Sequence, residues 1–591
     1  MMKWLILLFA FIGSSMGIAR AEMSVSPKAL NRQAVNQGAE QDYALDLKGG
    51  EWLAYYGNDN FLYVRRPDGA EVKLGAQDRQ IYQSGLALDV GQDSSAIMWR
   101  DKFPQKALYL LPELKADGPV PSPMVVGGAE SEPLTRLKVA RRNDAIYLLW
   151  LGEKPDPETK QKYYLYFRYS EDGGKTFSAV ERVLPGFYPM WIVDKDSIPV
   201  FSWVVSRERR AMTMRRFDRA TKTFGPAVEV AETPEQITPI YRAFESAGRW
   251  FVLWLAQYGD GKDFLLEGAY SEDKGQTWKR FAFDKVKGLD LSRLAVAADG
   301  EGHIGLAFSG SRRLRDDNPD AKDDLYFAYS TDNGTTWSEP RRFRSMEYQI
   351  THARFPVLSF GSQPGALVMA WEDWRDIRPN IYVAYSTDYG ATWQKEIPLG
   401  LPGRVNLTME YKLEQALVNR DKDYHLVVKR FENDALSKAD LVDYSFALTD
   451  LKQQSSLLPR GLELEKTRLN EERLRQRITQ YWNAMQREDY ATTYALMDAF
   501  FQNQVNRQAY QQKMGTIKYR SFRIDGIERQ GKIAKVKMTL EAEVPEFKTA
   551  SGKSYSKPKQ EYTFVDTWLF ITGNWYREYY EETSKIRYTK Y

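Results

Sequence analysis

The 591-residue chain contains no cysteine and only three histidines. Without cysteine the protein has no disulfide and no thiol that could accept a lipid. The histidines, His303, His352 and His425, are far apart in the sequence, and we see no zinc-ligand spacing, phosphate-binding loop or Ser/His/Asp signature. We therefore expect no metal and no cofactor. Structural roles are expected for all three histidines, and only His352 is placed where it could touch a ligand.

Long hydrophobic runs are also missing, apart from a short one near the start. Residues 1–21 carry Lys3, an apolar run from Leu5 to Gly13 and the sequence Ala19-Arg20-Ala21, which together predict a cleaved secretory signal. The run is too short to span a bilayer. The sequence thus predicts an exported protein, periplasmic or extracellular, with no transmembrane span after signal removal.

The formal net charge of the whole chain is only +4, but the charges are unevenly distributed. Residues 451–591 contain 25 Lys and Arg against 17 Asp and Glu, which is a net of +8. A basic C-terminal part could contact an anionic surface, although a solvated surface with evenly spread lysines explains the same composition. No nucleic-acid-binding motif is present, so we expect no nucleic-acid partner.

Four copies of one short motif are the most informative feature that the sequence does contain. They occupy Ser170–Phe177, Ser271–Trp278, Ser330–Trp337 and Ser386–Trp393, with the pattern Ser-x-Asp-x-Gly-x-Thr-aromatic. In such a turn the Asp carboxylate accepts backbone N–H bonds, the Gly supplies positive φ, and the aromatic ring packs between sheets. We therefore expect a structural role, not a catalytic one, for the four motif aspartates: Asp172, Asp273, Asp332 and Asp388.

The motif resembles the Asp box, or BNR repeat, of sialidases and related β-propellers. This resemblance implies a mainly β fold, with an Asp-box β-propeller over residues 22–450 whose boxes lie on the outer rim. A second repeated element is an apolar strand that usually closes on an aromatic residue. It ends in turn at Tyr56, Trp99, Trp150, Trp203, Trp254, Phe308, Trp371 and Val428. Eight blades are expected, or seven if the first and last units share one sheet.

Beyond the repeats we expect a linker over residues 451–462 and a small α+β domain over residues 463–591. Helical periodicity near Leu474 to Trp482 is followed by shorter helical patterns. Four β segments come next, with a polar loop at Lys548–Lys559. This order, together with the stretch Trp482–Tyr490, resembles the NTF2-like cone fold. The resemblance implies an accessory domain, which in that family can also enclose a ligand pocket.

Several arginines are expected at the mouth of the propeller's central funnel. Arg136, Arg293 and Arg354 fall on innermost strands, and Arg100, Arg313 and Arg375 fall in loops beside them. Converging guanidinium groups suit a carboxylate ligand because each offers paired donors in one plane. The alternative is that loop charges such as Asp373 and Arg375 only neutralise one another.

The sialidase resemblance also implies catalytic candidates. These are an arginine triad of Arg136, Arg293 and Arg354, a nucleophile Tyr411 beside Glu410, and an acid/base at Asp373 or Asp101. The Phe-Arg-Ile-Pro motif of that family is absent from this sequence, which weakens the catalytic assignment.

Our hypothesis is that the exported propeller recognises an anionic ligand, a glycan or a polypeptide, at an Arg-lined funnel. Two alternatives stay open. One is an active exo-sialidase or other glycoside hydrolase, and the other is a non-catalytic protein-binding or assembly scaffold. The sequence does not indicate the oligomeric state.

Overall fold

The computed structural model describes most of the chain beyond residue 26. The described residues are 27–33, 35, 41–46, 48–74, 85–91, 94–100, 106–134, 136–205, 210–233, 236–258, 261–314, 316–318, 321–344, 350–400, 406–410, 413, 416–431, 436, 439–455, 471–548, 552, 554–581, 586–589 and 591. The expected signal peptide, Asp101 and Tyr411 lie outside them. Among the described residues, no helix has the length and hydropathy needed to cross a membrane.

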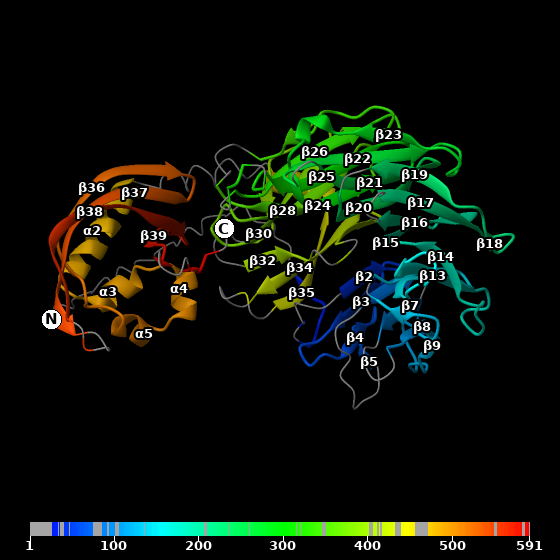
Figure 1. Ribbon diagram of the computed structural model, residues 1–591, viewed down its shortest axis with the longest axis horizontal. Coiled ribbons are helices and arrows are strands. Elements are labelled where there is room, and N and C mark those ends of the chain that lie inside the picture. The colour runs from blue at the N-terminus through cyan, green and yellow to red at the C-terminus, as the bar shows by residue number, and fades with distance from the viewer. Residues whose placement is uncertain are drawn as a thin grey trace, which may run out of the picture.

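In the described part of residues 28–447 the strands form eight antiparallel sheets of four or five strands. Except for β1, each sheet is made of strands that follow one another in the sequence (Figure 1). The first four sheets contain β2 (Gln41–Leu45), β3 (Glu51–Tyr56), β4 (Leu62–Arg65) and β5 (Glu71–Leu74); β6 (Leu86–Val90), β7 (Ser94–Arg100), β8 (Leu108–Lys115) and β9 (Met124–Gly127); β10 (Glu132–Pro133), β11 (Lys138–Arg142), β12 (Ala145–Glu153), β13 (Tyr163–Ser170) and β14 (Glu181–Pro185); and β15 (Phe187–Trp191), β16 (Ser197–Val205), β17 (Arg210–Asp218), β18 (Thr223–Phe224) and β19 (Val228–Thr233).

The other four sheets repeat this arrangement. They contain β20 (Gln236–Ser246), β21 (Arg249–Tyr258), β22 (Asp263–Ser271) and β23 (Lys279–Ala282); β24 (Asp290–Ala298), β25 (Ile304–Ser311), β26 (Asp324–Ser330) and β27 (Arg341–Arg342); β28 (Ala353–Phe360), β29 (Leu367–Asp373), β30 (Asn380–Ser386) and β31 (Ile397–Pro398); and β32 (Asn406–Met409), β33 (Leu417–Arg420), β34 (Asp423–Phe431) and β35 (Ala439–Ala447) with β1 (Lys28–Ala29). A short 3-10 helix, η1 (Asp284–Val286), precedes β24.

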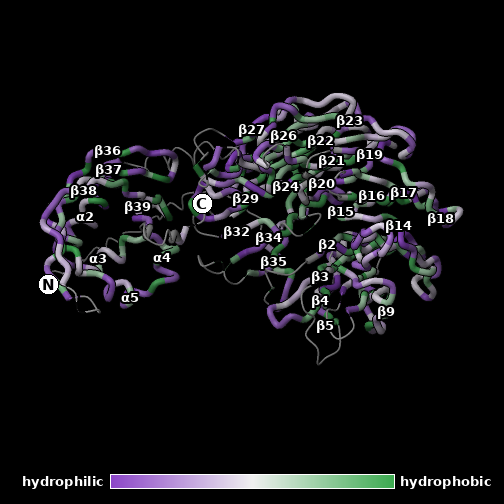
Figure 2. The backbone as a smooth tube through the Cα atoms, in the orientation of Figure 1, coloured by the Kyte–Doolittle hydropathy of each residue, from purple (hydrophilic) through white to green (hydrophobic). Residues whose placement is uncertain are grey.

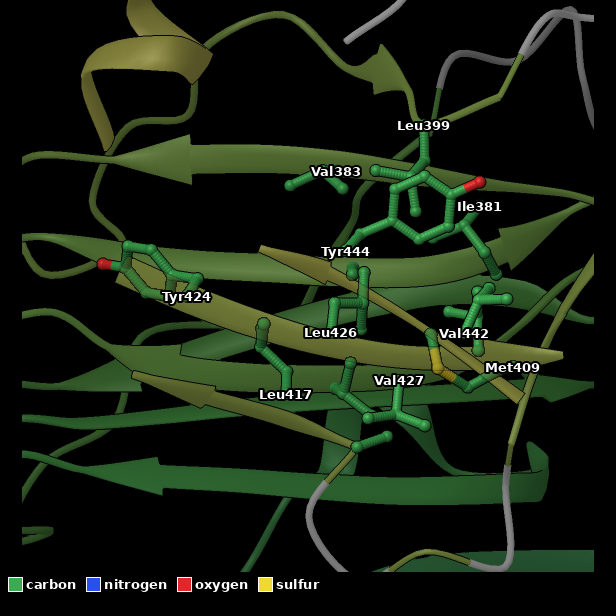
Figure 3. Close-up of a cluster of buried hydrophobic side chains, with 14 of the residues drawn as sticks. Ile381, Val383, Leu399, Met409, Leu417, Tyr424, Leu426, Val427, Val442 and Tyr444 are labelled. Atoms are coloured by element: carbon green, nitrogen blue, oxygen red, sulfur yellow. The ribbon is translucent and has the colours of Figure 1, made fainter. Parts of the chain in front are cut away.

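Hydrophobic side chains on both faces of the sheets hold neighbouring sheets together. Strands β25 and β29 are buried along their whole length, as expected where both faces of a sheet are covered. Buried clusters join each sheet to the next, and a cluster containing Leu53 and Tyr55 together with Val427 and Val442 joins the last sheet to the first. Figure 3 shows part of that cluster. In Figure 2 hydrophobic residues recur along the strands. The arrangement is that of a β-propeller.

The ring is closed by the N-terminal strand. β1 pairs antiparallel with β35, with Lys28 opposite Asp443, so that residues from the start of the chain complete the last sheet. In Figure 1 the blue strands β2 and β3 lie beside the yellow strands β34 and β35. Two side-chain pairs lie at this closing sheet: His425 on β34 bonds to Asp443 on β35 at 2.8 Å, and Lys28 on β1 pairs with Glu51 on β3. The first and last units therefore interlock at one sheet, the last of the eight.

All four box turns have the same hydrogen bonds. In the fourth, Asp388 Oδ1 accepts from Ser386 Oγ at 2.7 Å and from Thr392 N at 2.8 Å, and Asp388 Oδ2 accepts from Thr392 Oγ1 at 2.6 Å. The box glycine, Gly390, has φ +96°, and a Cβ there would lie 2.6 Å from the ring of Phe327 in the preceding sheet. Each box thus seals its own turn and packs against the neighbouring sheet.

The C-terminal part forms a separate unit of helices and one antiparallel sheet. Its helices are α2 (Glu471–Gln486), α3 (Tyr490–Ala495), α4 (Ala499–Gln504) and α5 (Arg507–Gln512), and its strands are β36 (Lys518–Gln530), β37 (Ile533–Lys548), β38 (Ser554–Ile571) and β39 (Asn574–Arg577), with a small pair β40 (Tyr580–Glu581) and β41 (Ile586–Arg587). The helices pack on one face of the sheet through a core that includes Trp482, Met538 and Trp568.

Residues 448–455 are helical, and Leu448 and Leu451 are buried against the last propeller sheet. The predicted linker, residues 451–462, begins in this helix and otherwise lies outside the described residues, so it stays a prediction. One local expectation was wrong. Within the segment Lys548–Lys559, expected as a polar loop, Lys548 and residues 554–559 are strand. They belong to β37 and β38, which extend as exposed paired strands in which Phe547 pairs with Tyr555. Cross-strand pairing overrides the polar composition there.

Replacing a box aspartate should lower the thermal stability of the protein without changing the structure of the central channel. Asp388→Asn replaces one of the two acceptor oxygens by an NH2 group, so at least one of the three hydrogen bonds is lost. We therefore expect a loss of about 1–3 kcal/mol and a lower melting temperature in calorimetry. The control is Asp421→Asn, an exposed turn residue. An unchanged melting temperature for Asp388→Asn would contradict a structural role for the box.

The closure should make stability depend on pH. Burial, reinforced by neighbouring Glu51, raises the pKa of Asp443 to about 6 against the opposing bond from His425. Because this pKa is higher in the folded than in the unfolded state, its stabilising contribution is present below pH 4 and is lost as the pH rises through 6. Asp443→Asn should therefore flatten the fall in urea midpoint between pH 5 and pH 7.5.

The bond to Asp443 also raises the pKa of His425. His425 therefore also contributes stability that is lost as the pH rises. Glu51 acts only at lower pH, because its bonds to Asp443 and Lys28 outweigh burial and lower its pKa. Asp440→Asn on the same strand is the control. If Asp443→Asn and Asp440→Asn gave the same pH slope as the parent protein, the closure would not be the titrating element.

Candidate functional site

The first strands of neighbouring sheets lie side by side and line the centre of the ring. Several of them are interrupted by a register shift at a similar position: Phe187–Met190 in β15, Ile237–Tyr241 in β20, Leu291–Arg293 in β24 and Arg354–Val357 in β28. Such bulges re-aim side chains and are frequent beside active sites. The four bulges mark the channel wall as the candidate site.

Backbone strain is concentrated on the same wall. Arg136, Tyr188 and Phe355 have φ of 72°, 58° and 56°, a region that bulky residues rarely adopt. Strain of this kind persists only where the surrounding structure enforces it, and it is commonest at ligand sites. The sequence did carry a signal for this feature: Tyr188-Pro189, Thr238-Pro239 and Phe355-Pro356 each place a proline, which cannot donate to the ladder, inside a first strand.

One side of the channel carries an arginine between two tyrosines. Arg136 Nη1 donates to the Tyr241 hydroxyl, and the Arg136 guanidinium lies 5.3 Å from the Tyr188 ring and 5.8 Å from the Tyr241 ring. The two rings are 5.3 Å apart. Burial raises the pKa of Tyr241, although the nearby charges of Arg136 and Arg242 oppose that rise, so its hydroxyl stays protonated. Arg136 itself is exposed and offers further donors to a ligand.

The other side carries a group of charged residues on the sixth and seventh sheets, which we call the Arg354 corner. It consists of Asp290, Arg313, Asp323, His352 and Arg354. Asp290 lies 3.8 Å from Arg313, and His352 Nδ1 accepts from Asp323 N at 3.1 Å. The side chains of Asp323, His352 and Arg354 are 16%, 19% and 27% exposed, so the corner is sheltered but open to solvent.

The titrating groups of the corner have perturbed pKa values. Burial, reinforced by the positive charge of Arg354, lowers the pKa of His352 to about 3, so its ring is neutral at ordinary pH. Burial raises the pKa of Asp323, against the charge of Arg354 and a bond from Ser292, and burial likewise raises the pKa of Asp290. A sheltered carboxyl that binds its proton more tightly than usual, beside an arginine, is an arrangement typical of functional sites.

The three arginines proposed as a triad each have a separate partner. Arg136 bonds to Tyr241, Arg293 Nη2 donates to the Leu413 carbonyl at 3.1 Å, and Arg354 Nε donates to Glu372 Oε1 at 2.8 Å. The bonds of Arg136 and Arg293 join different sheets, and the bond of Arg354 joins β28 to β29. Arg293 and Arg354 lie on the first strands β24 and β28, whereas Arg136 lies between β10 and β11. All three stay predicted ligand residues.

The loop arginines differ widely in exposure. Arg100 is buried and lies 3.5 Å from Glu132, whereas the Arg313 side chain is 51% exposed. Arg375 is buried, pairs with Asp373 at 2.6 Å and with Glu396, and stacks over the Tyr382 ring at 4.1 Å. Of these three side chains, Arg313 is the one with free access to a dissolved ligand.

The catalytic candidates occupy places of little access. Asp373 is fully buried and accepts from Trp371 Nε1 at 2.9 Å, Arg375 Nη2 at 2.6 Å and Arg344 Nη1 at 3.3 Å. Burial alone would raise the pKa of Asp373, but these two arginines outweigh burial and hold the pKa at about 2. Such a carboxylate does not serve as a proton donor. Glu410 is also fully buried, 2.5 Å from Lys429, while its expected neighbour Tyr411 lies outside the described residues.

Two groups of described residues bring carboxylates and a histidine together closely enough to hold a metal ion: Glu51, His425 and Asp443, and Asp299, Glu301 and His303. Lys28 and Arg65 already neutralise Glu51 in the first group. In the second, Asp299 caps its own turn by accepting from the backbone of Glu301 and His303.

Comparison with known proteins adds a family match and several likenesses of fold. The BNR/Asp-box repeat family matches residues 328–339, which contain the third box. No curated protein shows significant similarity to the chain. Among solved structures, a PL25 ulvan lyase bound to -[GlcA(1-4)Rha3S]- is 12% identical, with 62% of this chain and 94% of that chain covered and a TM-score of 0.38.

Two sialidase-type structures are similar at the same low level. The leech intramolecular trans-sialidase complexed with 2,7-anhydro-Neu5Ac is 11% identical, with 73% of this chain and 95% of that chain covered and a TM-score of 0.31. Trypanosoma rangeli sialidase in complex with the inhibitor DANA is 12% identical, with coverages of 74% and 82% and a TM-score of 0.28. At such scores these likenesses carry no argument about ligand or activity.

The substitution Asp373→Asn tests whether Asp373 stabilises the fold. Removing its charge leaves buried Arg344 and Arg375 without a carboxylate, and breaking a buried ion pair in this way costs about 3–5 kcal/mol. We therefore expect a large drop in melting temperature by calorimetry. Asp196→Asn, on an exposed turn where Asp196 pairs with Lys274 at 3.3 Å, should change it little. A stable Asp373→Asn protein that has lost only an activity would instead restore Asp373 as a catalytic candidate.

Proposed function

We propose that this chain is an exported, eight-bladed Asp-box propeller that binds a carboxylate-bearing saccharide at its central channel, with an NTF2-like accessory domain. The observation that carries the proposal is the strained, bulged channel wall that presents Arg136 between Tyr188 and Tyr241. Eight consecutive sheets packed in a closed ring support the blade number. Four helices on one face of an antiparallel sheet support the NTF2-like assignment.

The chemistry of the wall suits an acidic sugar. Aromatic faces pack against the C–H surfaces of a sugar ring, and a guanidinium offers paired donors to a carboxylate. On the seventh sheet, the guanidinium of Arg354 lies 5.1 Å from the ring of Phe355, which repeats the same pairing of an arginine with an aromatic ring. A ligand with both an apolar ring face and a carboxylate would use both kinds of contact.

Binding can be tested by isothermal calorimetry with a galacturonic acid trimer and with its methyl ester, which keeps the sugar but loses the charge. The acid should bind and the ester should bind at least tenfold more weakly. Arg136→Gln should weaken binding of the acid about tenfold or more, because a charge-assisted hydrogen bond is worth about 1.5–3 kcal/mol. Arg142→Gln, at the other end of the same segment and 3.1 Å from Asp89, is the matched control.

Equal affinities for acid and ester would contradict a carboxylate site. If neither the trimer nor any other acidic saccharide bound, the protein-binding scaffold would become the leading hypothesis.

A second candidate function is cleavage of an acidic glycan, and Asp323 is the observation that favours it. Its sheltered carboxyl has a raised pKa next to Arg354, as a general acid requires. A fluorogenic sialoside and the galacturonic acid trimer are suitable substrates. Turnover that is abolished by Asp323→Asn, with binding retained, would support catalysis. Turnover that is unaffected would exclude Asp323 as the acid.

A further inference from the structure

The C-terminal unit docks on the loop between β29 and β30 of the propeller. A mixed cluster brings Trp374 and Ile377 of that loop together with residues of the C-terminal unit: Phe500, Ile533, Leu569, Ile571 and Tyr591. Lys532 Nζ, 12% exposed, bonds to Asp376 Oδ1 at 2.6 Å, and Arg378 Nη1 donates to Thr572 Oγ1 at 3.1 Å. In Figure 1 the C-terminal end lies between the two units, beside β28 and β30.

The docked loop has a backbone conformation that needs external support. Ile377 has φ +67° and is fully buried. A β-branched residue at positive φ is a genuine outlier, and such strain persists only where other contacts over-determine it. Since the Ile377 side chain packs in the cluster shared with the C-terminal unit, docking is one of the contacts that hold the loop in this shape.

Trp374 connects this docked loop to the Arg354 corner. Its indole Nε1 donates to Glu372 Oε1 at 2.7 Å, and the same oxygen accepts from Arg354 Nε at 2.8 Å. Its ring lies 5.7 Å from the Arg354 guanidinium. Its backbone N–H donates to the His352 carbonyl at 2.9 Å, and His352 Nδ1 in turn accepts from Asp323 N. One residue of the interface thus orients both Arg354 and the strand end that carries His352.

We propose that Trp374 is a positioning residue through which docking of the C-terminal unit orients Arg354 for an acidic ligand. The proposal rests on the proposed saccharide-binding function of the channel. It assigns the C-terminal unit a role in that site without any contact between the unit and the ligand. Undocking should release the β29–β30 loop, allow Trp374 to leave Glu372, and let Arg354 adopt orientations that no longer suit the ligand.

Two variants of the C-terminal unit break the docking contact at a distance from the channel. Lys532→Met leaves Asp376 without its ammonium partner, and Ile571→Ala removes apolar contact from the shared cluster. Lys537→Met, an exposed position on the same strand as Ile533, is the matched control. Circular dichroism should show all three to be folded. If Lys532→Met fails this check, Ile571→Ala carries the test.

Hydrogen exchange of the full-length protein measures the coupling between the docked C-terminal unit and the Arg354 corner without any ligand. The amides of Ala353, which donates to Asp323 O, and of Trp374, which donates to His352 O, should exchange faster in both docking variants than in the control. Faster exchange at the interface around residues 569–571 with unchanged exchange at residues 352–374 would overturn the proposal. The exchange test gives a result even if the galacturonic acid trimer does not bind. Failure of the proposed saccharide-binding function can therefore be distinguished from failure of this inference.

Calorimetry with the galacturonic acid trimer completes the test through a double-mutant cycle. Lys532→Met alone should weaken binding about fivefold or more, whereas in an Arg354→Gln background it should have no further effect, because both changes remove the same interaction. An equal loss in both backgrounds would show that docking acts on the site by another route. No loss in the parent background, with docking broken, would show that the channel is indifferent to the C-terminal unit.

Discussion

Burial of both faces of every sheet is the constraint on which the rest of this structure depends. A sheet with two apolar faces is stable only between two others, so a row of such sheets must end in exposed apolar faces unless it closes on itself. Here the cluster that joins Leu53 and Tyr55 to Val427 and Val442 removes the two ends. The channel is a consequence of that closure, because the first strands of all sheets then meet around one axis. The site chemistry follows from which side chains those strands place on the wall.

Most of the propeller could be predicted from the sequence because its signals are local. The box turns repeat, and each needs the same aspartate, glycine and aromatic residue within eight positions of chain. The apolar second strands end on buried rings such as Trp150 and Trp371, which the repeat spacing indicated. The extended β37–β38 hairpin was not foreseen, since its strands are polar and are held by pairing with each other.

The candidate site was only partly predictable. The arginines Arg136, Arg293 and Arg354 stay predicted ligand residues, and composition cannot show which partners they find. Asp373 and Arg375 illustrate the difficulty: both were expected near a ligand, and both are buried in one ion-pair network with Arg344 and Glu396. Linear order placed them at the end of the strand β29, whereas their burial depends on how the loop after that strand folds against Arg344, Tyr382 and Glu396. The prolines at the bulges carry a more useful signal that the sequence analysis did not use, because loss of a ladder donor is a local property.

The closing strand has a consequence for the order in which the protein folds. The amide of Leu441 donates to Asn31, a residue 410 positions away, so the last sheet has no outer strand until both ends of the propeller chain are available. A domain dominated by such distant pairings folds slowly and leaves strand edges exposed while it does so. During synthesis the first seven sheets can pack in succession, but the ring itself forms only after the eighth has emerged. If the chain is exported, this long-range step favours passage through the membrane before the propeller has locked.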